Sequence, residues 1–381
     1  MKKRNKKKNH SLIQNIIFSF IALFGLTVAA VFLILNRNLE KDIEKKEAEL
    51  TGVIDEYKAQ FPYSQSDYDE AVTGNRNLGI GEGKENLRMQ IKGSLDNGET
   101  IISVLRNLFP EYIISYKNKY NFYPIDYNQK MDKYKRSNFL IERENSGNAG
   151  GEDDNQDGAD ADDKNKGDVT EIKYVDDSGV VVSAKGIDVS SHQGKIDWEK
   201  VKADGVDFAF LRLGGRGTTE GAIYLDQTFI YNVENATKNG IKVGVYFYTQ
   251  ATSAEEAIEE AEFVIENIEP YDITYPVAYD IENTNDRTKK LNKENYTECT
   301  RAFVDTIAKA GYRPMIYGNL NSMVEIIDQS QFEDIDKWFA QYNDDYYYPY
   351  EIAIWQYSSK GRVDGISGLV DLNIGLKHYD G

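Results

Sequence analysis

Cysteine is almost absent from this chain, which has only Cys299 in 381 residues. A single cysteine cannot form an internal disulfide, so disulfide-stapled folds are excluded. Cys299 falls in a helical pattern, which does not favour a catalytic thiol. Three scattered histidines and one cysteine give no zinc-ligand spacing either. We therefore expect neither a metal nor a cofactor.

Positive charge is also scarce, with 45 lysines and arginines against 63 acids and a formal net charge of −18. This balance argues against nucleic-acid binding through a basic surface. The length allows two domains.

The N-terminus is the exception to this acidic balance. Residues 2–8 hold six basic residues and no acid, and an uncharged apolar run follows over 16–36. That run has the length of a membrane span, and the basic flank should stay in the cytoplasm. We expect a cytoplasmic tail over 1–15 and an uncleaved signal-anchor helix over 16–36, with everything after it facing the cell wall. A cleaved signal peptide is the alternative, but the apolar run continues past the small residues at 28–30.

Two regions follow the expected anchor. Residues 37–144 read as a small, mainly helical extracellular region, which could be a domain, a stalk or a partner-binding surface. Residues 145–170 form an acidic linker that lacks the residues to bury a core. Within it, 153–158 imitates the start of a calcium loop, but Lys164 stands where the loop needs an acid. A solvated spacer is therefore favoured over a calcium site.

Residues 275–283, Tyr-Pro-Val-Ala-Tyr-Asp-Ile-Glu-Asn, read as a buried strand that ends in two acids. Side chains alternate along a strand, so Asp280 and Glu282 share one face with Pro276 and Ala278. Glycoside hydrolysis uses two neighbouring carboxylates, one of which donates a proton. A solvated strand end is the alternative reading of this motif.

Asp188 and Asp371 also stand near the ends of short apolar segments, early and late in the second half of the chain. Alternating strand and helix patterns between them predict parallel strands joined by helical crossovers. If this sheet closes, its first and last strands are neighbours, and all four acids gather at one end. The expected strands are 185–190, 208–214, 242–248, 275–282, 314–319, 337–342, 352–357 and 369–374, and the expected helices lie near 195–203, 226–239, 253–268 and 292–310.

From Lys185 to its end, the chain resembles the glycoside hydrolase family 25 lysozymes, also called Chalaropsis-type muramidases. The resemblance rests on ordered motifs: Gly-Ile-Asp-Val-Ser-Ser-His-Gln-Gly (186–194), Ile-Asp-Trp-Glu-Lys-Val-Lys (196–202), Phe-Ala-Phe-Leu-Arg (208–212), Gly-Ile-Lys-Val-Gly-Val-Tyr-Phe-Tyr (240–248), Asp280-x-Glu282, Tyr317-Gly318, Trp338-Phe339-Ala340, Trp355-Gln356-Tyr357 and Val370-Asp371. It implies an α/β fold, an incomplete (β/α) TIM-like barrel over 171–381 with eight strands and about five helices. One departure is Ile281, where many members carry an aromatic residue; it should face away from the site.

The resemblance also implies an activity: cleavage of the β-1,4 bond between N-acetylmuramic acid and N-acetylglucosamine in peptidoglycan. Glu282 would be the general acid. Asp280 would stabilise the developing charge or orient the substrate's 2-acetamido group. Asp188 and Asp371 would orient the sugar and tune the pair, with structural hydrogen bonding at strand ends as their alternative role.

Aromatic side chains late in the strands could stack on sugar faces. The candidates for substrate binding are Tyr246, Tyr248, Tyr317, Trp338 and Trp355, with Tyr342, Tyr357 and His192 as weaker ones. Ordinary core packing is the alternative for each ring. Arg212 could offset the acids, or it could form a surface ion pair.

Two other functions stay open. A catalytically silent module could use the same acids to hold cell-wall glycan strands, although Glu282 is present. A different acetamido-sugar hydrolase, such as a chitinase-like barrel, would need a longer Asp-rich run than 275–283 offers. The expected partners are peptidoglycan strands and, through the N-terminal helix, the membrane.

Overall fold

The computed structural model describes residues 89, 91–95, 99–116, 119–144, 167–282 and 287–379. The chain divides into two compact units, Met1–Leu108 and Phe109–Gly381. In the first unit, helix α4 (Ile101–Leu108) buries Ile101, Ile102, Val104 and Leu105 along one face. No helix within the described ranges is long and apolar enough to cross a membrane. The expected anchor over 16–36 lies outside the described residues.

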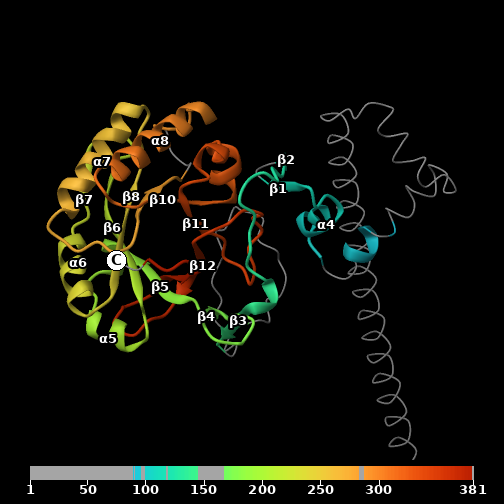
Figure 1. Ribbon diagram of the computed structural model, residues 1–381, viewed down its shortest axis with the longest axis horizontal. Helices are drawn as coiled ribbons and strands as arrows, with labels where there is room; N and C mark the ends of the chain where they lie inside the picture. Colours follow the sequence, from blue (N-terminus) through green and yellow to red (C-terminus); the bar gives the residue numbers. More distant parts are fainter. Residues whose placement is uncertain are drawn as a thin grey trace, which may run out of the picture. The chain divides into compact units, whose positions relative to one another are not determined.

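Eight strands of the second unit form a closed ring (Figure 1). Hydrogen bonding between β5 and β6 closes it. In ring order, the strands are β5 (Ala184–Val189), β13 (Val370–Gly375), β12 (Ile354–Gly361), β11 (Asp336–Ala340), β10 (Pro314–Asn319), β9 (Val277–Asp280), β8 (Lys242–Tyr248) and β6 (Phe208–Arg216). Each of the eight expected strands is confirmed within a few residues, and a short strand, β7 (Ile223–Leu225), extends the sheet antiparallel to β6.

Seven of these strands run in the same direction, but β13 runs antiparallel to both of its neighbours, β12 and β5. The prediction of parallel strands throughout is therefore wrong for the last strand. Only residues 362–369 join β12 to β13, which is too short for a helical crossover and suits a hairpin. Asp371 consequently lies near the start of β13, at the same end of the ring as the carboxyl ends of the other strands.

The four expected helices are confirmed on the outside of the ring (Figure 1). Helix α7 shows why: Ala257, Ala261, Val264 and Ile268 repeat at helical spacing and form its buried face. Its N-cap, Ser253, accepts a hydrogen bond from the Glu256 backbone. The α-helices of this unit are α5 (Trp198–Ala203), α6 (Phe229–Lys238), α7 (Ala254–Ile268) and α8 (Lys293–Lys309). After β10 only short turns, η3 (Ser322–Ile326) and η4 (Gln329–Phe332), follow instead of a fifth long helix.

Alternation along the strands divides the core into two parts. One face of each strand packs outward, against the helices for most strands, and the other fills the ring with side chains such as Phe208, Phe210 and Trp338. Gly186 makes room for this filling, because a Cβ there would lie 2.1 Å from the Phe208 ring. Ile281 is buried in the outer part, as its sequence position predicts.

Strands from the preceding region lie beside the ring, where β4 contacts β12 and β13 (Figure 1). Strands β1 (Tyr112–Tyr116) and β2 (Tyr120–Pro124) form an antiparallel hairpin, and β3 (Phe139–Arg143) pairs with β4 (Val169–Tyr174). The expectation of a mainly helical region is therefore wrong from residue 112 onward. Aromatic and β-branched residues dominate these segments and suit strands.

Side chains tie these strands to the ring. The Phe139 ring meets Trp355 of β12 edge to face at 5.7 Å. Glu325 accepts hydrogen bonds from Ser115 at 2.6 Å and Asn121 at 3.1 Å. The residues from Phe109 onward thus belong to the same compact unit as the ring.

This changes the expected domain boundary at 145–170. Because β3 and β4 pair with each other, the acidic segment connects two strands of one unit rather than two domains. The backbone N–H of Glu144 also donates to the Asp168 carbonyl at 3.0 Å. Residues 145–166 themselves lie outside the described residues.

Candidate active site

Four acids meet at one end of the ring, and we call them the acid cup: Asp188, Asp280, Glu282 and Asp371. Asp188 is the penultimate residue of β5 and Asp280 the last of β9. Asp371 stands directly opposite Asp188 in the antiparallel register. Glu282 follows β9 and repels both Asp188 and Asp371 electrostatically. The structure therefore brings together all four acids that the sequence singles out.

Asp188 is held by two side-chain amides. Gln356 Nε2 and Asn373 Nδ2 each donate to its Oδ2 at 2.8 Å. Burial raises the pKa of Asp188 to about 6, against these two hydrogen bonds and with repulsion from Glu282 adding to the rise. The amides position this carboxyl group and favour its charged form.

Further donors fix the orientation of both amides. The hydroxyl groups of Tyr317 and Tyr342 donate to Gln356 Oε1 at 2.8 and 3.0 Å. Trp338 Nε1 donates to Asn373 Oδ1 at 2.7 Å. The indole N–H of Trp338 can only donate, and the two tyrosine hydroxyls donate here, so these groups occupy the amide oxygens. The amide nitrogens of Gln356 and Asn373 therefore face Asp188.

Gln356 and Asn373 escaped the sequence-based choice of site residues. The sequence signal that could have identified them is that each is a polar residue within an otherwise apolar strand. Both residues are at most 2% exposed, so each needs hydrogen-bond partners inside the ring.

Of the two acids at the end of β9, Asp280 is more enclosed than Glu282, with 4% of its surface exposed. Burial, followed by repulsion from Glu282 and Asp188, raises its pKa well above the ordinary value, while Arg212 opposes the rise. Its Oδ1 atom has no hydrogen-bond partner among the described residues. A ligand that donates an N–H or O–H there would satisfy a buried acceptor.

Glu282 and Asp371 form the more accessible side of the acid cup. Glu282 is exposed at the rim, yet the protein around it still raises the pKa of its carboxyl group by desolvation. Burial raises the pKa of the half-buried Asp371 to about 8, and repulsion from Asp188 and Glu282 adds to the effect. The acid cup therefore holds protons near neutral pH that ordinary carboxyl groups would release.

Aromatic rings form the floor below these acids. Trp338 is 1% exposed and stacks on Phe210 with centroids 4.4 Å apart. Tyr246 and Tyr317 are half-buried and meet Trp338 edge to face, at 5.9 and 4.5 Å. Tyr248 is also half-buried, and its backbone pairs with Asp280. The three tyrosines thus keep an accessible surface near the acids, whereas Trp338 supports them from beneath.

Trp355 and Tyr357 lie elsewhere. They occupy the outward face of β12, since Gln356 between them faces the acid cup. Trp355 is fully buried in the outer core and its Nε1 donates to the Gln341 carbonyl at 2.8 Å. This placement corrects the expectation that Trp355 binds substrate, and it also removes Tyr357.

Arg212 is a half-buried bridge rather than a surface ion pair. Its Nε donates to Asp226 at 2.8 Å, and its Nη2 donates to Ser191 at 2.9 Å. Asp226 is fully buried in this pair. Arg212 opposes the rise in the pKa of Asp280, so its positive charge acts against the repulsion within the acid cup. His192 is exposed in the short turn that follows β5.

Within the part of the chain that the structure describes, no three His, Cys, Asp or Glu side chains are grouped as metal ligands would be. The buried thiol of Cys299 is poorly suited to nucleophilic chemistry, because burial raises its pKa to about 12.

Comparison with known proteins gives a consistent result. The model of the glycosyl hydrolases family 25 matches residues 187–366. Lysozyme M1 of Streptomyces globisporus is 30% identical over 223 residues, which are 53% of this chain and 69% of that protein. The autolytic lysozyme of Clostridium acetobutylicum is 30% identical over 194 residues, which are 50% of this chain and 55% of that protein.

Solved structures are also similar to about half of the chain. The modular autolysin LytC of Streptococcus pneumoniae shares 28% identity with a TM-score of 0.46, over 54% of this chain and 50% of that one. The chain thus spans only about half the length of the autolytic lysozyme and of LytC.

Proposed function

Because this chain belongs to the glycosyl hydrolases of family 25, we propose that it hydrolyses peptidoglycan as a muramidase. The bond cleaved is the β-1,4 linkage between N-acetylmuramic acid and N-acetylglucosamine. The observation that carries this proposal is the acid cup, where four carboxyl groups from distant parts of the chain meet at one end of the ring. Burial, together with repulsion within the group, raises the pKa of Asp188, Asp280 and Asp371.

Glu282 is the proton donor in this proposal. Cleavage requires a proton on the leaving oxygen while positive charge grows at the anomeric carbon. The pKa of Glu282 is raised, and its exposure at the rim lets it reach a bound glycan strand. A carboxyl group that keeps its proton near neutral pH suits a general acid.

Asp280 is the partner that must become negatively charged. In the free protein, burial and then repulsion from Glu282 and Asp188 disfavour the ionised form of Asp280, and we expect the two acids to share a proton. A 2-acetamido N–H that donates to the unpartnered Oδ1 of Asp280 would favour the anion there, so the shared proton would sit on Glu282. Substrate binding itself would then set the protonation state that the reaction needs, and the acetamido oxygen could act as internal nucleophile.

Asp188 and Asp371 tune this pair and orient the sugar, while Tyr246, Tyr248 and Tyr317 offer ring faces beside it. A reaction through a growing cation also benefits from the negative charge that Asp280 carries in this proposal.

The variant Glu282→Gln tests the donor. We expect the release of reducing ends from purified peptidoglycan to fall about 10²- to 10⁴-fold, with an unchanged melting temperature. Glu262→Gln, the same change on the exposed face of α7, should leave the rate unaltered. An unchanged rate for Glu282→Gln would remove this residue from its role.

The identity of the new reducing ends tests the bond. Muramic-acid ends support a muramidase, glucosamine ends would mean a glucosaminidase, and binding without release would mean a silent glycan-binding module.

We also propose that residues 16–36 anchor the protein in the cell membrane with the ring facing the wall. The support is the basic segment at 2–8 followed by an uncharged apolar run. Fractionation should recover the full-length chain with membranes, and deletion of 1–36 should release it. Recovery of a shortened chain in the medium would instead mean a cleaved signal peptide.

A further inference from the structure

The backbone that carries Glu282 is held by the part of the chain that follows β10. The register between β9 and β10 ends at the pair Asp280 and Tyr317. One residue further, the Ile281 N–H donates to the Tyr317 carbonyl at 3.2 Å. The Ile281 carbonyl then accepts a hydrogen bond of 2.8 Å from the Ser322 hydroxyl. Because a peptide group is planar, fixing the Ile281 carbonyl also fixes the direction in which the backbone enters Glu282.

Further contacts place Ser322 itself. It is buried, and its backbone N–H donates to Asn319 Oδ1 at 3.0 Å. Its carbonyl accepts from the Ile327 N–H at 3.2 Å, which is the i to i+5 bond of the π turn η3. Gly318 lets this turn approach β10, because a Cβ at that position would lie 2.7 Å from the Ser322 Cβ. Single π turns are rare and occur often at functional sites.

Glu325, three residues further along the same turn, contacts the β1–β2 hairpin. Its Oε1 accepts from the Ser115 hydroxyl at 2.6 Å and from Asn121 Nδ2 at 3.1 Å. Burial, and then the charge of Glu325 and a hydrogen bond with it, raises the pKa of Tyr123 in β2. The turn η3 is therefore bound to the hairpin through Glu325 and to the end of β9 through Ser322.

We propose that Ser322 is a positioning residue for Glu282, and that the β1–β2 hairpin keeps Ser322 in place through Glu325. This inference rests on the proposed role of Glu282 as proton donor. The turn η3 lies within residues 187–366, which the family model matches, whereas the hairpin lies outside them. A segment that precedes the family region thus contributes to the geometry of the reaction.

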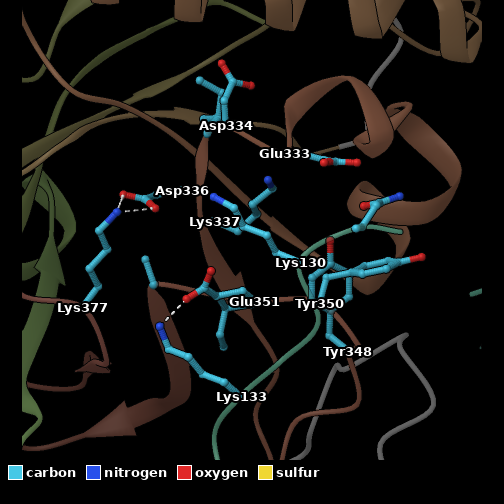
Figure 2. A pocket seen from close by; sticks show the side chains of 14 residues that line it. Lys130, Lys133, Glu333, Asp334, Asp336, Lys337, Tyr348, Tyr350, Glu351 and Lys377 are labelled. Atoms are coloured by element: carbon cyan, nitrogen blue, oxygen red, sulfur yellow. Dashed lines mark hydrogen bonds and ion pairs between the residues drawn. The ribbon is translucent and has the colours of Figure 1, made fainter. Parts of the chain in front are cut away.

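The region before the ring also contacts it at the opposite end, beside a cavity of about 210 Å³ at the amino ends of β11 and β12 (Figure 2). Lys133 pairs there with Glu351, and the Tyr350 hydroxyl accepts from the Asp126 N–H at 2.9 Å. These contacts supply a control, since they join the same two parts of the chain at the end of the ring remote from the acid cup.

Kinetics of the full chain on a soluble peptidoglycan fragment test the role of Ser322. Ser322→Ala should lower kcat about 10- to 100-fold and change KM by less than about threefold, because a proton donor displaced by about 1 Å loses rate rather than binding. Thr300→Val is the matched control, since this fully buried hydroxyl of α8 also donates to a backbone carbonyl, that of Tyr296, at 2.7 Å. It should lower the melting temperature and keep kcat. An unaltered kcat for Ser322→Ala, or an equal loss of kcat in Thr300→Val, would overturn the proposal.

Variants of Glu325 test the part played by the hairpin. Glu325→Met removes the acceptor and should lower kcat about 3- to 10-fold, whereas Glu325→Gln keeps an acceptor oxygen and should recover most of that rate. Lys133→Met, which breaks a contact at the other end of the ring, should leave kcat unaltered. Ser322→Ala and Glu325→Met act along one path, so the double variant should lose less than the product of the two single losses. Losses that multiply in full would overturn the role of the hairpin.

Hydrogen exchange separates this inference from the proposed function. The backbone amides of Ile281 and Glu282 should exchange at least about tenfold faster in Ser322→Ala than in the unaltered chain, and Thr300→Val should not share this increase. If the unaltered chain releases no muramic-acid ends, the proposed function fails, but faster exchange still shows that Ser322 holds the backbone at Glu282. Unchanged exchange in Ser322→Ala, in a chain that does hydrolyse peptidoglycan, would overturn the positioning role alone.

Discussion

Asp371 should lower the stability of the folded chain at neutral pH, so that Asp371→Asn stabilises the protein while impairing catalysis. The residue is half-buried in the acid cup. Burial, with repulsion from Asp188 and Glu282, raises its pKa from 3.8 to about 8. Asparagine has almost the same shape and carries no charge, so the substitution removes the electrostatic cost without leaving a cavity.

The size of the effect follows from proton linkage. A folded state with the raised pKa holds a proton that the unfolded chain releases, so stability falls as pH rises from about 4 to about 8. At pH 7 an isolated group with this shift would cost about 4 kcal/mol, at 1.36 kcal/mol per pH unit. Part of this cost is repulsion that Asp371 shares with Asp188, and the titration of the two groups is therefore linked. We expect Asp371→Asn to raise the free energy of unfolding by about 1 to 3 kcal/mol.

Urea denaturation followed by circular dichroism at pH 5 and pH 8 measures this gain. The stability of Asp371→Asn should depend less on pH than that of the unaltered chain, and its gain should be smaller at pH 5 than at pH 8, because the cost builds up only above the ordinary pKa of an aspartate. Asp226→Asn is the opposite control. Although burial alone would raise the pKa of Asp226, hydrogen bonds from Thr228 and Ser191 and the Arg212 guanidinium hold it below its ordinary value. That variant should lose stability, most of all at neutral pH. A loss of similar size for Asp371→Asn would refute the reasoning.

Three further substitutions or truncations follow from the structure. Gln356→Leu should lower the hydrolysis rate about 10- to 100-fold and stability by about 1 to 3 kcal/mol, since it leaves two tyrosine hydroxyls and one carboxylate short of a partner. Without this hydrogen bond the pKa of Asp188 should rise, so a pH–rate profile whose acidic limb does not shift upward would contradict this prediction. Gly186→Ala should destabilise the ring by at least about 2 kcal/mol, measured by urea denaturation, because its methyl group meets the Phe208 ring, and a smaller residue at 208 should recover part of that loss. A fragment over 109–381 should unfold cooperatively on heating, whereas 171–381 should unfold at a lower temperature or aggregate; equal melting temperatures would contradict the extended unit.

The strands and the acids at their ends could be predicted because the signal is local. Each strand is a short apolar run with period-two alternation, and closure of the ring brings the ends together without further information. Asp188 and Asp280 needed only their strand positions to be placed correctly.

Other features depend on neighbours that the local pattern does not reveal. Both faces of a strand inside a closed ring are buried, so alternation shows that Trp355 and Gln356 face opposite ways but not which of them faces inward. The aromatic residue looked like the sugar-binding one, and the structure places the amide in the acid cup instead. The direction of β13 depends on the length of one loop, 362–369, which the parallel pattern of the earlier strands obscured.

The extent of the folding unit was the hardest feature to foresee, because it depends on how much of the ring the helices cover. The ring has α5 to α8 on one side, and after β10 the connections shorten to turns. The outward face of β12 still carries Trp355, whose ring is fully buried and therefore covered by other parts of the chain. Phe139 of β3 and Tyr346 of the loop after β11 provide that cover, at 5.7 and 5.1 Å from its ring. A ring that lacks helices must bury its apolar surface against something else, and here the strands that precede the acidic segment do so. The motifs that identify the family begin at residue 185, but the hydrophobic surface they create is completed only by residues that come before them.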